Sequence, residues 1–206
     1  MTEKEKMLSG MIYDPSDSEL SNIRREAHNL CLDYNKLYED DPKRKEIIDK
    51  LFPHNNGVYL QGPIYFDYGL FTSFGKNCYA NFNLTILDCA PVDIGDDVFI
   101  GTSVSIVTPV HPMLYDERKL YEKADGVMTD KEYAKPIKIM NGVWICSNST
   151  ITGGVTIGEG SVIGAGSVVV NDIPPYTLAA GNPCKPIRKI DKSESIYLKK
   201  KLFEQI

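Results

Sequence analysis

The sequence predicts a mainly β protein built around a parallel β-helix, with a helical cap before it and a short C-terminal helix after it. Aliphatic residues recur every six positions in two series, and glycines directly follow several of them: Ile94, Ile100 and Ile106, then Ile139, Ile145, Ile151, Ile157, Ile163 and Val169, with Gly95, Gly101, Gly158 and Gly164. This period is neither that of an α-helix nor that of a simple alternating strand. It indicates short strands joined by corners, three to a coil, with the aliphatic residues stacked inside. We expect glycine or a small polar residue where the chain turns.

The composition is that of a soluble globular protein in a single unit. The chain has 206 residues, 42% hydrophobic and 25% charged. A formal net charge of -5 argues against a nucleic-acid surface. The N-terminus has no signal-peptide pattern, and no stretch is apolar enough to span a membrane. Five scattered cysteines without a CxxC pair favour neither a disulfide framework nor a zinc cluster, so we expect a cytoplasmic protein.

Residues 1–56 predict the helical cap. Thr2 with Glu5, and Ser16 with Glu19, match the capping-box pattern of a helix start. An apolar stripe at three- and four-residue steps then predicts an amphipathic helix: Leu20, Ile23, Ala27, Leu30, Tyr34 and Leu37. A further helix is expected to start at Pro42 and to end before Pro53.

Residues 57–190 predict the β-helix domain. Thirty-three residues separate Ile106 from Ile139, which is not a multiple of six, so we expect a loop insertion at about 108–136. Long loops in compact domains are frequently functional. Residues 191–206 are expected to form a C-terminal helix with an exposed run of lysines.

Only three histidines are present, and one of them stands apart. His28 falls in the cap and His54 in a turn after Pro53, where we expect structural or solvated side chains. His111 lies where the repeat gives way to the insertion, so its side chain can face a groove. It is the candidate for chemistry.

Several segments resemble the maltose and galactoside O-acetyltransferase family over almost the whole chain: YFDYG (65–69), YANFNLTILD (79–88), IGDDVFIG (94–101), VHP (110–112), NGVWICS (141–147), GVTIGEGSVIGAGSVV (154–169) and NDIPPYTLAAGNPCKPIRKI (171–190). The resemblance implies a left-handed β-helix and an acyltransferase that moves the acetyl group of acetyl-CoA to a sugar hydroxyl, in maltose, glucose or a galactoside. It also implies a homotrimer with active sites between subunits, and no metal.

The resemblance also implies roles for individual residues. His111 matches the catalytic base, since a histidine ring can take a proton near neutral pH. Asn81 matches the asparagine that stabilises the oxyanion and contacts the acceptor, with a backbone amide near Ser147 as a second donor. Further acceptor contacts match Asp67, Asp88 and Asp17. Coenzyme contacts match Ser147, Ala165, Lys185 and Arg188.

This sequence departs from the family pattern at several of these positions. Asp67 replaces a serine, Cys89 replaces an aspartate, and Pro15 occupies the position of an acceptor-binding aspartate, which makes Asp17 its nearest substitute. Lys185 replaces an arginine that could contact a phosphate through two donors. The acceptor and the coenzyme affinity therefore stay open.

Several alternatives stay open at this level. Cys78 or Cys146 could carry the acetyl group, although buried packing suits them as well. The acceptor could be an amine or another non-sugar group, or the chain could be a non-catalytic trimeric scaffold. A zinc enzyme on the same scaffold would need three converging histidines, which their spacing disfavours. Trp144 could line a groove or pack in the core.

Overall fold

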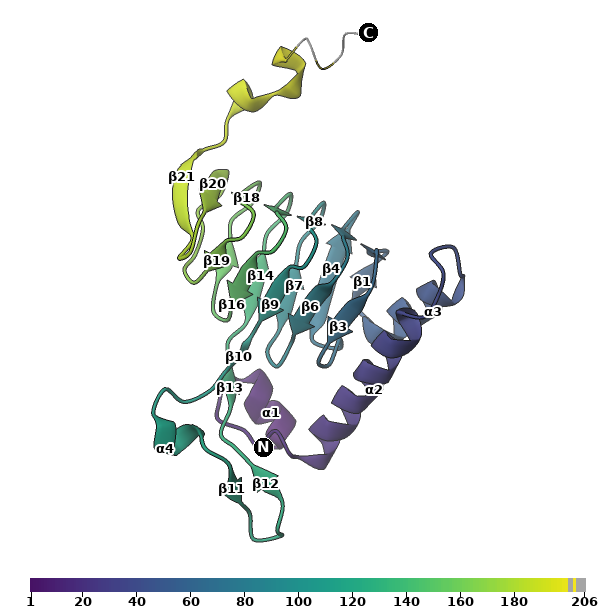
Figure 1. The fold of residues 1–206 in the computed structure, drawn as a ribbon, viewed down its shortest axis with the longest axis vertical. Helices are drawn as coiled ribbons and strands as arrows, with labels where there is room; N and C mark the ends of the chain where they lie inside the picture. Colours follow the sequence, from purple (N-terminus) through teal and green to yellow (C-terminus); the bar gives the residue numbers. More distant parts are fainter. Residues whose placement is uncertain (200–201, 203–206) are drawn as a thin grey trace.

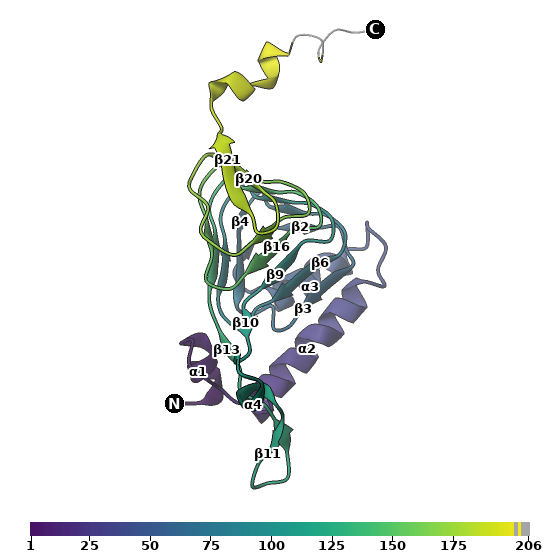
Figure 2. The same cartoon turned by 60° about the vertical axis from the view of Figure 1, so that its left-hand side comes forward.

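The structure is a computed structural model that describes residues 1–199 and 202. Its centre is a parallel β-helix with a triangular cross-section, built from three sheets (Figures 1 and 2). The helical cap lies at one end, and the C-terminal segment projects from the other (Figure 1). No helix in the described part of the chain is long and apolar enough to cross a membrane.

The three sheets are named here sheet I, sheet II and sheet III. Sheet I holds β1 (Asn55–Asn56), β4 (Thr72–Lys76), β7 (Val92–Ile94), β14 (Ile137–Ile139) and β17 (Thr156–Ile157). Sheet II holds β2 (Tyr59–Leu60), β5 (Tyr79–Ala80), β8 (Phe99–Ile100), β15 (Trp144–Ile145), β18 (Val162–Ile163), β20 (Thr177–Ala180) and the antiparallel β21 (Lys185–Lys189). Sheet III holds β3 (Ile64–Phe66), β6 (Leu84–Leu87), β9 (Ser105–Val107), β16 (Thr150–Thr152) and β19 (Val168–Val169).

The two six-residue series lie directly on top of each other. Ile94 pairs with Ile139, Ile100 with Ile145, and Ile106 with Ile151, each on a different sheet. Every residue of both series is at most 3% exposed. The predicted stacked aliphatic core is confirmed, and the second series continues the first across the insertion.

The prediction that the glycines of the six-residue repeat stand where the chain turns is only partly right. Gly95, Gly101, Gly158 and Gly164 do not have positive φ. A Cβ on Gly101 would lie 2.6 Å from the backbone nitrogen of Ser147, so that glycine is required by close approach of the next coil. The left-handed corner positions are other residues: Asn77, Asn83, Asp97, Ser103, Gly142, Asn148, Gly154, Gly160 and Gly166.

The helical cap forms α1 (Glu3–Leu8), α2 (Ser18–Tyr34) and α3 (Lys43–Leu51). The Thr2–Glu5 capping box at α1 is present as predicted. The predicted box at Ser16 and Glu19 is wrong. Asp17 is the N-cap instead, because its carboxylate accepts from the amides of Glu19 and Leu20, while the Ser16 hydroxyl donates to Asp14.

Aromatic rings close the end of the β-helix core beneath α3. Phe52 meets Phe66 and Phe74 edge-on, with ring centroids 4.6 and 5.4 Å away. All three rings are at most 2% exposed. Leu51 fills the space beside Gly69, where a Cβ would lie 2.5 Å from a Leu51 side-chain atom. This plug removes from water the apolar residues that the first coil would otherwise expose.

The insertion between β9 and β14 is partly ordered into small elements. These are β10 (Pro109–Val110), α4 (Tyr115–Arg118), β11 (Tyr121–Glu122), β12 (Met128–Thr129) and β13 (Tyr133–Ala134). β10 pairs with β13, and β11 with β12, both antiparallel. At the C-terminus, the described part of the expected helix forms two 3₁₀ turns, Lys192–Glu194 and Ile196–Leu198, rather than an α-helix, and the remainder lies outside the described residues.

Candidate active site

His111 lies directly after β10, at the edge of the β-helix where sheet III gives way to sheet I. Its side chain is 49% exposed, and its Nδ1 lies 3.2 Å from a carboxylate oxygen of Asp130. When the neutral ring carries its proton on Nδ1, beside this carboxylate, Nε2 is unprotonated and can accept a proton from a ligand. The pair therefore has the arrangement of a base and the residue that orients it.

A second carboxylate, that of Glu132, lies close enough to His111 and Asp130 to interact with both through its charge. Tyr13 donates its hydroxyl to Glu132 at 2.7 Å, and the Tyr13 amide donates to the Glu132 carbonyl at 3.0 Å. Burial raises the pKa of Glu132, and the hydrogen bond from Tyr13 and the charge of His111 offset part of that rise. Glu132 thus adds negative charge close to His111.

The N-terminal segment holds this part of the insertion in place. Asp14 accepts from Lys123 at 2.7 Å and from the hydroxyl of Thr129 at 2.5 Å. Although burial opposes the shift, these bonds hold the pKa of Asp14 well below its usual range. Thr129 directly precedes Asp130, so the segment before α2 positions the residue that faces His111.

Asp67 belongs to the same neighbourhood. It follows β3, and its Oδ1 lies 3.4 Å from Nε2 of His28 while the Cys89 thiol donates to its Oδ2 at 3.7 Å. Its charge also raises the pKa of Glu132. Asp67 and Cys89, two of the departures from the family pattern, therefore lie side by side, and His28 unexpectedly lies beside them.

Asp88 does not reach this site. It is fully buried, and its carboxylate accepts from the amides of Tyr68, Gly69 and Phe71 and from the Thr72 hydroxyl at 2.8–3.3 Å. Burial raises its pKa to about 6, although the amide hydrogen bonds oppose the rise. In this structure Asp88 holds the turn after Asp67. Asp17, at the start of α2, is committed to the helix N-cap.

Asn81 lies on a different edge of the triangle, between sheets II and III. It follows β5, and its amide donates to the Ile100 carbonyl at 2.9 Å. Its Oδ1 accepts from the Phe82 amide at 2.8 Å. Nothing in the described chain pairs with its side-chain NH₂ group. That group is free to donate to a ligand.

Ser147 and Ala165 continue this edge toward the C-terminal end. Ser147 follows β15 and Ala165 follows β18, so both occupy the corner that Asn81 occupies in its own coil. The Thr102 amide donates to the Ser147 hydroxyl at 3.2 Å, and the Gly166 amide to the Ser147 carbonyl at 3.0 Å. Trp144, which is 52% exposed on β15, does not pack in the core. One chain thus separates its sequence-predicted site residues onto two edges.

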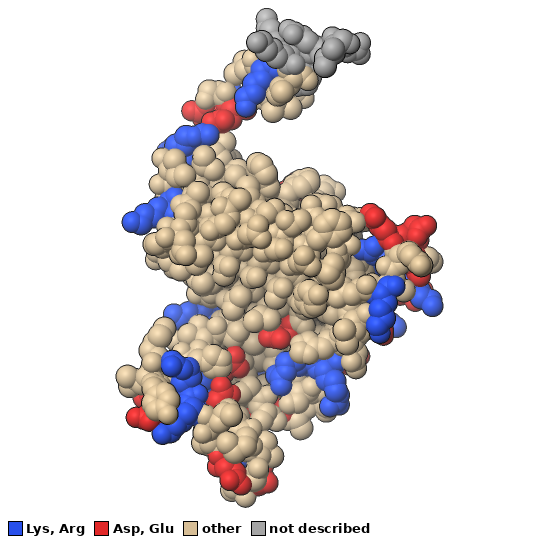
Figure 3. Space-filling view, viewed as in Figure 1, with Lys and Arg blue, Asp and Glu red and all other residues tan. Residues whose placement is uncertain are grey.

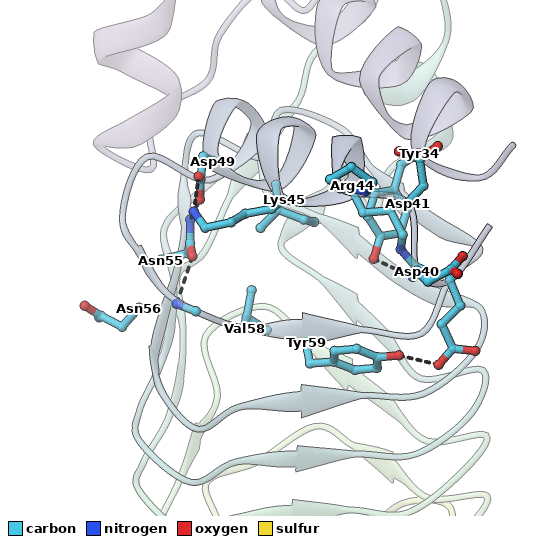
Figure 4. Close-up of a pocket in the computed structure, with 14 residues that line it drawn as sticks. Tyr34, Asp40, Asp41, Arg44, Lys45, Asp49, Asn55, Asn56, Val58 and Tyr59 are labelled. Atoms are coloured by element: carbon cyan, nitrogen blue, oxygen red, sulfur yellow. Dashed lines mark hydrogen bonds and ion pairs between the residues drawn. The ribbon is translucent and has the colours of Figure 1, made fainter. Parts of the chain in front are cut away.

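A cavity of about 490 Å³ lies elsewhere, between α3 and the first coil (Figure 4). Its polar groups are paired with each other. Arg44 donates to the Tyr34 hydroxyl at 2.7 Å and to the Leu60 carbonyl at 2.6 Å, and Tyr59 donates to Glu39. None of the residues predicted for the site lines it.

Comparisons with known proteins show the family of this chain. The model of the maltose acetyltransferase hexapeptide capping motif matches residues 6–55, and models of hexapeptide repeats match 91–111 and 136–171. The galactoside O-acetyltransferase of Escherichia coli K12 is 39% identical to this chain. The match covers 97% of this chain and 95% of that protein. The chain belongs to the maltose and galactoside O-acetyltransferase family. It is therefore an acyltransferase of the hexapeptide-repeat class.

Solved structures of other hexapeptide-repeat acetyltransferases have the same fold. A maltose O-acetyltransferase from Clostridium difficile superimposes with a TM-score of 0.84 at 39% identity, over 93% of this chain and 99% of that one. A hexapeptide-repeat acetyltransferase from Vibrio cholerae, solved in complex with acetyl coenzyme A, superimposes with a TM-score of 0.81 at 35% identity. The match covers 93% of this chain and 100% of that one. The capping motif and the repeats therefore correspond to the cap and the β-helix seen here.

The basic pair expected to contact coenzyme in this acetyltransferase lies on β21. Lys185 is exposed at the start of the strand, and Arg188 forms an ion pair with Glu194 in the first 3₁₀ turn. Lys185 is thus open to an anionic ligand. Arg188 would have to share or leave Glu194 to bind one.

Neither cysteine of the covalent alternative has an activated thiol. Cys78 is buried and Cys146 half-buried, and burial raises the pKa of both thiols. A raised pKa disfavours the thiolate that would attack the thioester. Among the residues that the structure describes, no group of three or more His, Cys, Asp or Glu side chains is arranged to hold a metal ion.

Sequence reasoning missed four contributors to the site of this acetyltransferase: Tyr13, His28, Asp130 and Glu132. Asp130 and Glu132 lie in the insertion, which has no repeat to fix their positions. The sequence pattern that points to these two carboxylates is a charged insertion directly after an isolated histidine. It could indicate a carboxylate partner, but not which one.

Proposed function

We propose that this protein is an acetyl-CoA-dependent O-acetyltransferase acting on a hydroxyl of a sugar such as maltose, glucose or a galactoside. The observation that carries the proposal is the His111–Asp130 pair, in which the imidazole is half-exposed and its Nδ1 lies 3.2 Å from a carboxylate oxygen. The related Vibrio cholerae enzyme binds acetyl coenzyme A, and the Escherichia coli relative is named for galactosides. The first supports acetyl-CoA as the donor, and the second supports a sugar as the acceptor.

The proposed reaction is direct transfer. Nε2 of His111 removes the proton of the acceptor hydroxyl while its oxygen attacks the carbonyl carbon of the thioester. The carbonyl oxygen becomes an oxyanion, which the side-chain NH₂ of Asn81 and a backbone amide near Ser147 stabilise as donors. The intermediate then collapses, the carbon–sulfur bond breaks, and the leaving thiolate takes the proton held by His111.

The separation of the site residues supports a homotrimer. His111 lies on the edge between sheets III and I, whereas Asn81, Ser147 and Ala165 follow the edge between sheets II and III. A single chain therefore does not bring the base to the oxyanion donors. We propose that the first edge of one chain meets the second edge of its neighbour, which completes three identical sites in a closed ring.

The side of the triangle between these two edges would then face the three-fold axis. This side is sheet III, and its outward positions along the coils are uncharged: Tyr65, Thr85, Ser105, Thr150 and Val168. The matching positions of sheet I include Asp93 and Lys138. Figure 3 shows a broad face without charged side chains over the coils. An uncharged face fits burial between subunits better than a charged one.

The coenzyme is proposed to lie along the second edge, with its phosphates toward β21. Lys185 supplies an exposed ammonium there, and Arg188 supplies a second cation once it leaves Glu194. A lysine makes a point contact where an arginine can make two parallel hydrogen bonds. The five free cysteines fit the reducing cytoplasm, where we propose that the protein acts.

The decisive experiment is a thiol-release assay with acetyl coenzyme A against maltose, glucose, methyl galactoside and matched amine acceptors. We expect turnover on a sugar and a loss of roughly 10²- to 10⁴-fold in His111→Ala, the usual contribution of a general base. His54→Ala is the matched control, because His54 is exposed in the turn between α3 and β1. Turnover on amines alone, or unchanged turnover in His111→Ala, would refute the proposal.

A further inference from the structure

The segment after β21 projects from the end of the β-helix, and the proposed reaction gives it no role (Figures 1 and 2). In this segment Ile196, Leu198 and Leu202 are 53%, 67% and 66% exposed. Lys199 lies between them and is exposed, and the sequence continues the run of lysines through residues 200–201, which lie outside the described part. Single exposed aliphatic side chains are common on protein surfaces. Three of them around a run of lysines, in so short a segment, are not explained by solvation of the lysines.

Positive charge gathers at this same end of the molecule. Residues 185–206 contain seven Lys or Arg and three Asp or Glu, although the net charge of the whole chain is -5. Figure 3 shows Lys and Arg side chains along β21 and the projecting segment. Lys189, Lys192 and Lys199 are all exposed. This end of the molecule is therefore complementary in charge to an anionic partner.

The pairing of β21 determines where the segment leaves the β-helix. Lys189 pairs with Thr177 at the start of β20, and the Ile190 amide donates to the Tyr176 carbonyl at 2.7 Å. Tyr176 lies at the corner between sheets I and II, because β20 follows it in sheet II and Ile173 before it bridges to β17 of sheet I. In the proposed homotrimer sheet III faces the three-fold axis, so this corner is the one farthest from the axis. The three segments would then project from three outer corners at the same end of the ring.

We propose that the three C-terminal segments form a docking surface for an anionic lipid bilayer. The repetition around the ring rests on the proposed homotrimer. Three separated points at one end of a ring fit a broad, flat partner that all of them can contact together. The lysine ammonium groups would lie at the anionic headgroups, while the side chains of Ile196 and Leu198 enter the boundary between headgroups and acyl chains. The cytoplasmic leaflet is anionic, which fits the compartment proposed above.

The mixture of lysines and aliphatic residues favours a bilayer over a soluble acidic protein. An acidic protein surface would pair with the lysines alone, whereas a bilayer offers both negative charge and an apolar layer beneath it. One short segment of this kind binds a bilayer only marginally. Three linked segments bind much more tightly, because the second and third contacts form within one complex. Binding should therefore depend on charge and on the aliphatic side chains together.

The test is co-sedimentation of the purified protein with vesicles, made either of phosphatidylcholine alone or of an equimolar mixture with phosphatidylglycerol. We expect the mixed vesicles to bind the protein more tightly by about tenfold or more, with the difference falling as salt screens the charges. Lys192→Gln combined with Lys199→Gln should weaken this binding by about tenfold or more. Ile196→Ser combined with Leu198→Ser should weaken it by a similar factor.

The matched control removes the same charge from the helical cap. Lys36→Gln combined with Lys45→Gln should leave vesicle binding unchanged, since these side chains are 72% and 81% exposed on the cap, away from the projecting segment. Equal binding to both kinds of vesicle, or unchanged binding in either variant of the segment, overturns the proposal. Binding to soluble polyglutamate as tight as to the mixed vesicles would also overturn it, because an acidic polymer would then suffice.

Sedimentation velocity keeps this inference apart from the proposed function. Loss of the trimer in Ile196→Ser combined with Leu198→Ser would show that these side chains lie between subunits, and would overturn the docking surface. A wild-type protein that sediments as a monomer would contradict the homotrimer instead, and the vesicle assay would still test the segment. Vesicle binding does not depend on turnover, so a failure of the thiol-release assay leaves this test intact.

Discussion

Asp130 is the residue on which the proposed chemistry most depends after His111 itself. In the proposed mechanism its carboxylate, 3.2 Å from Nδ1, favours the tautomer with a proton on Nδ1 and holds the direction of the imidazole without touching the substrate. It is thus a positioning residue. We expect Asp130→Asn to lower kcat by about tenfold or more, less than the loss in His111→Ala, because the ring keeps its position but loses its anionic partner.

A fall in kcat without a change in the KM for acetyl coenzyme A would support that role. KM for acetyl coenzyme A should stay unchanged in Asp130→Asn, and Asp130→Glu should recover part of the lost kcat. Asp116→Asn is the control, since Asp116 is exposed on α4 of the same insertion and pairs only with Lys119 among the described residues. If Asp130→Asn raised the KM for coenzyme as strongly as it lowered kcat, the insertion rather than the histidine would have been disturbed.

Asp88 matches the family pattern, but in this structure its carboxylate holds a turn. Four donors converge on its buried carboxylate, from Tyr68 through Thr72. Asp88→Ala would leave them without an acceptor, which we expect to destabilise the protein by roughly 3 kcal/mol or more. Asp88→Asn retains one acceptor oxygen and should cost less. Urea unfolding of the two variants measures the difference, and a loss below about 1 kcal/mol in Asp88→Ala would contradict this account.

At the scale of elements, the contact between the N-terminal segment and the insertion should depend on pH. The pKa of Asp14 is lowered from its usual 3.8 in the folded protein, so its ionised form stabilises the contact. For a lowered carboxyl pKa, this stabilisation is present above the unfolded value and is lost as the pH falls through the folded value. The contact should therefore hold at neutral pH and weaken progressively below about pH 4.

Amide hydrogen exchange of residues 121–132, corrected for the intrinsic pH dependence of exchange, reports this contact. Protection should fall below about pH 4 in the wild-type protein and should already be low at neutral pH in Asp14→Asn. Asp125→Asn is the matched control, because Asp125 also lies near Lys123, at 3.8 Å, but is 62% exposed. Equal protection in Asp14→Asn and the wild-type protein at neutral pH would show that Asp14 does not hold the insertion.

Elements with a period were predictable and elements without one were not. The six-residue series fixed the register of coils separated by the insertion, because every inward position repeats. The stripe of α2 likewise predicted a buried helix face. The insertion depends on contacts with Tyr13 and Asp14, more than a hundred residues away, and no local pattern encodes those. Asp130 and Glu132 were missed for that reason.

At the scale of the whole molecule, the β-helix holds the predicted site residues on two separate edges. Its coils stack Asn81, Ser147 and Ala165 on one edge, while the insertion carries His111 from another. The sequence predicted these residues through a family resemblance, but only the sheet topology shows that they belong to different edges. The proposal of a site shared between chains rests on that separation.

Mixed trimers test whether the site is shared. His111→Ala keeps an intact Asn81 edge, and Asn81→Ala keeps an intact His111 edge, so each homotrimer should be nearly inactive. In trimers formed from equal amounts of both, about one site in four should combine His111 of one chain with Asn81 of its neighbour. Co-expression with two different affinity tags isolates these mixed species. Under random assembly we expect about a quarter of wild-type activity in the unseparated mixture and about a third in the isolated mixed trimers, each of which holds one complete site of three. Sites built within one chain would stay inactive in every mixture.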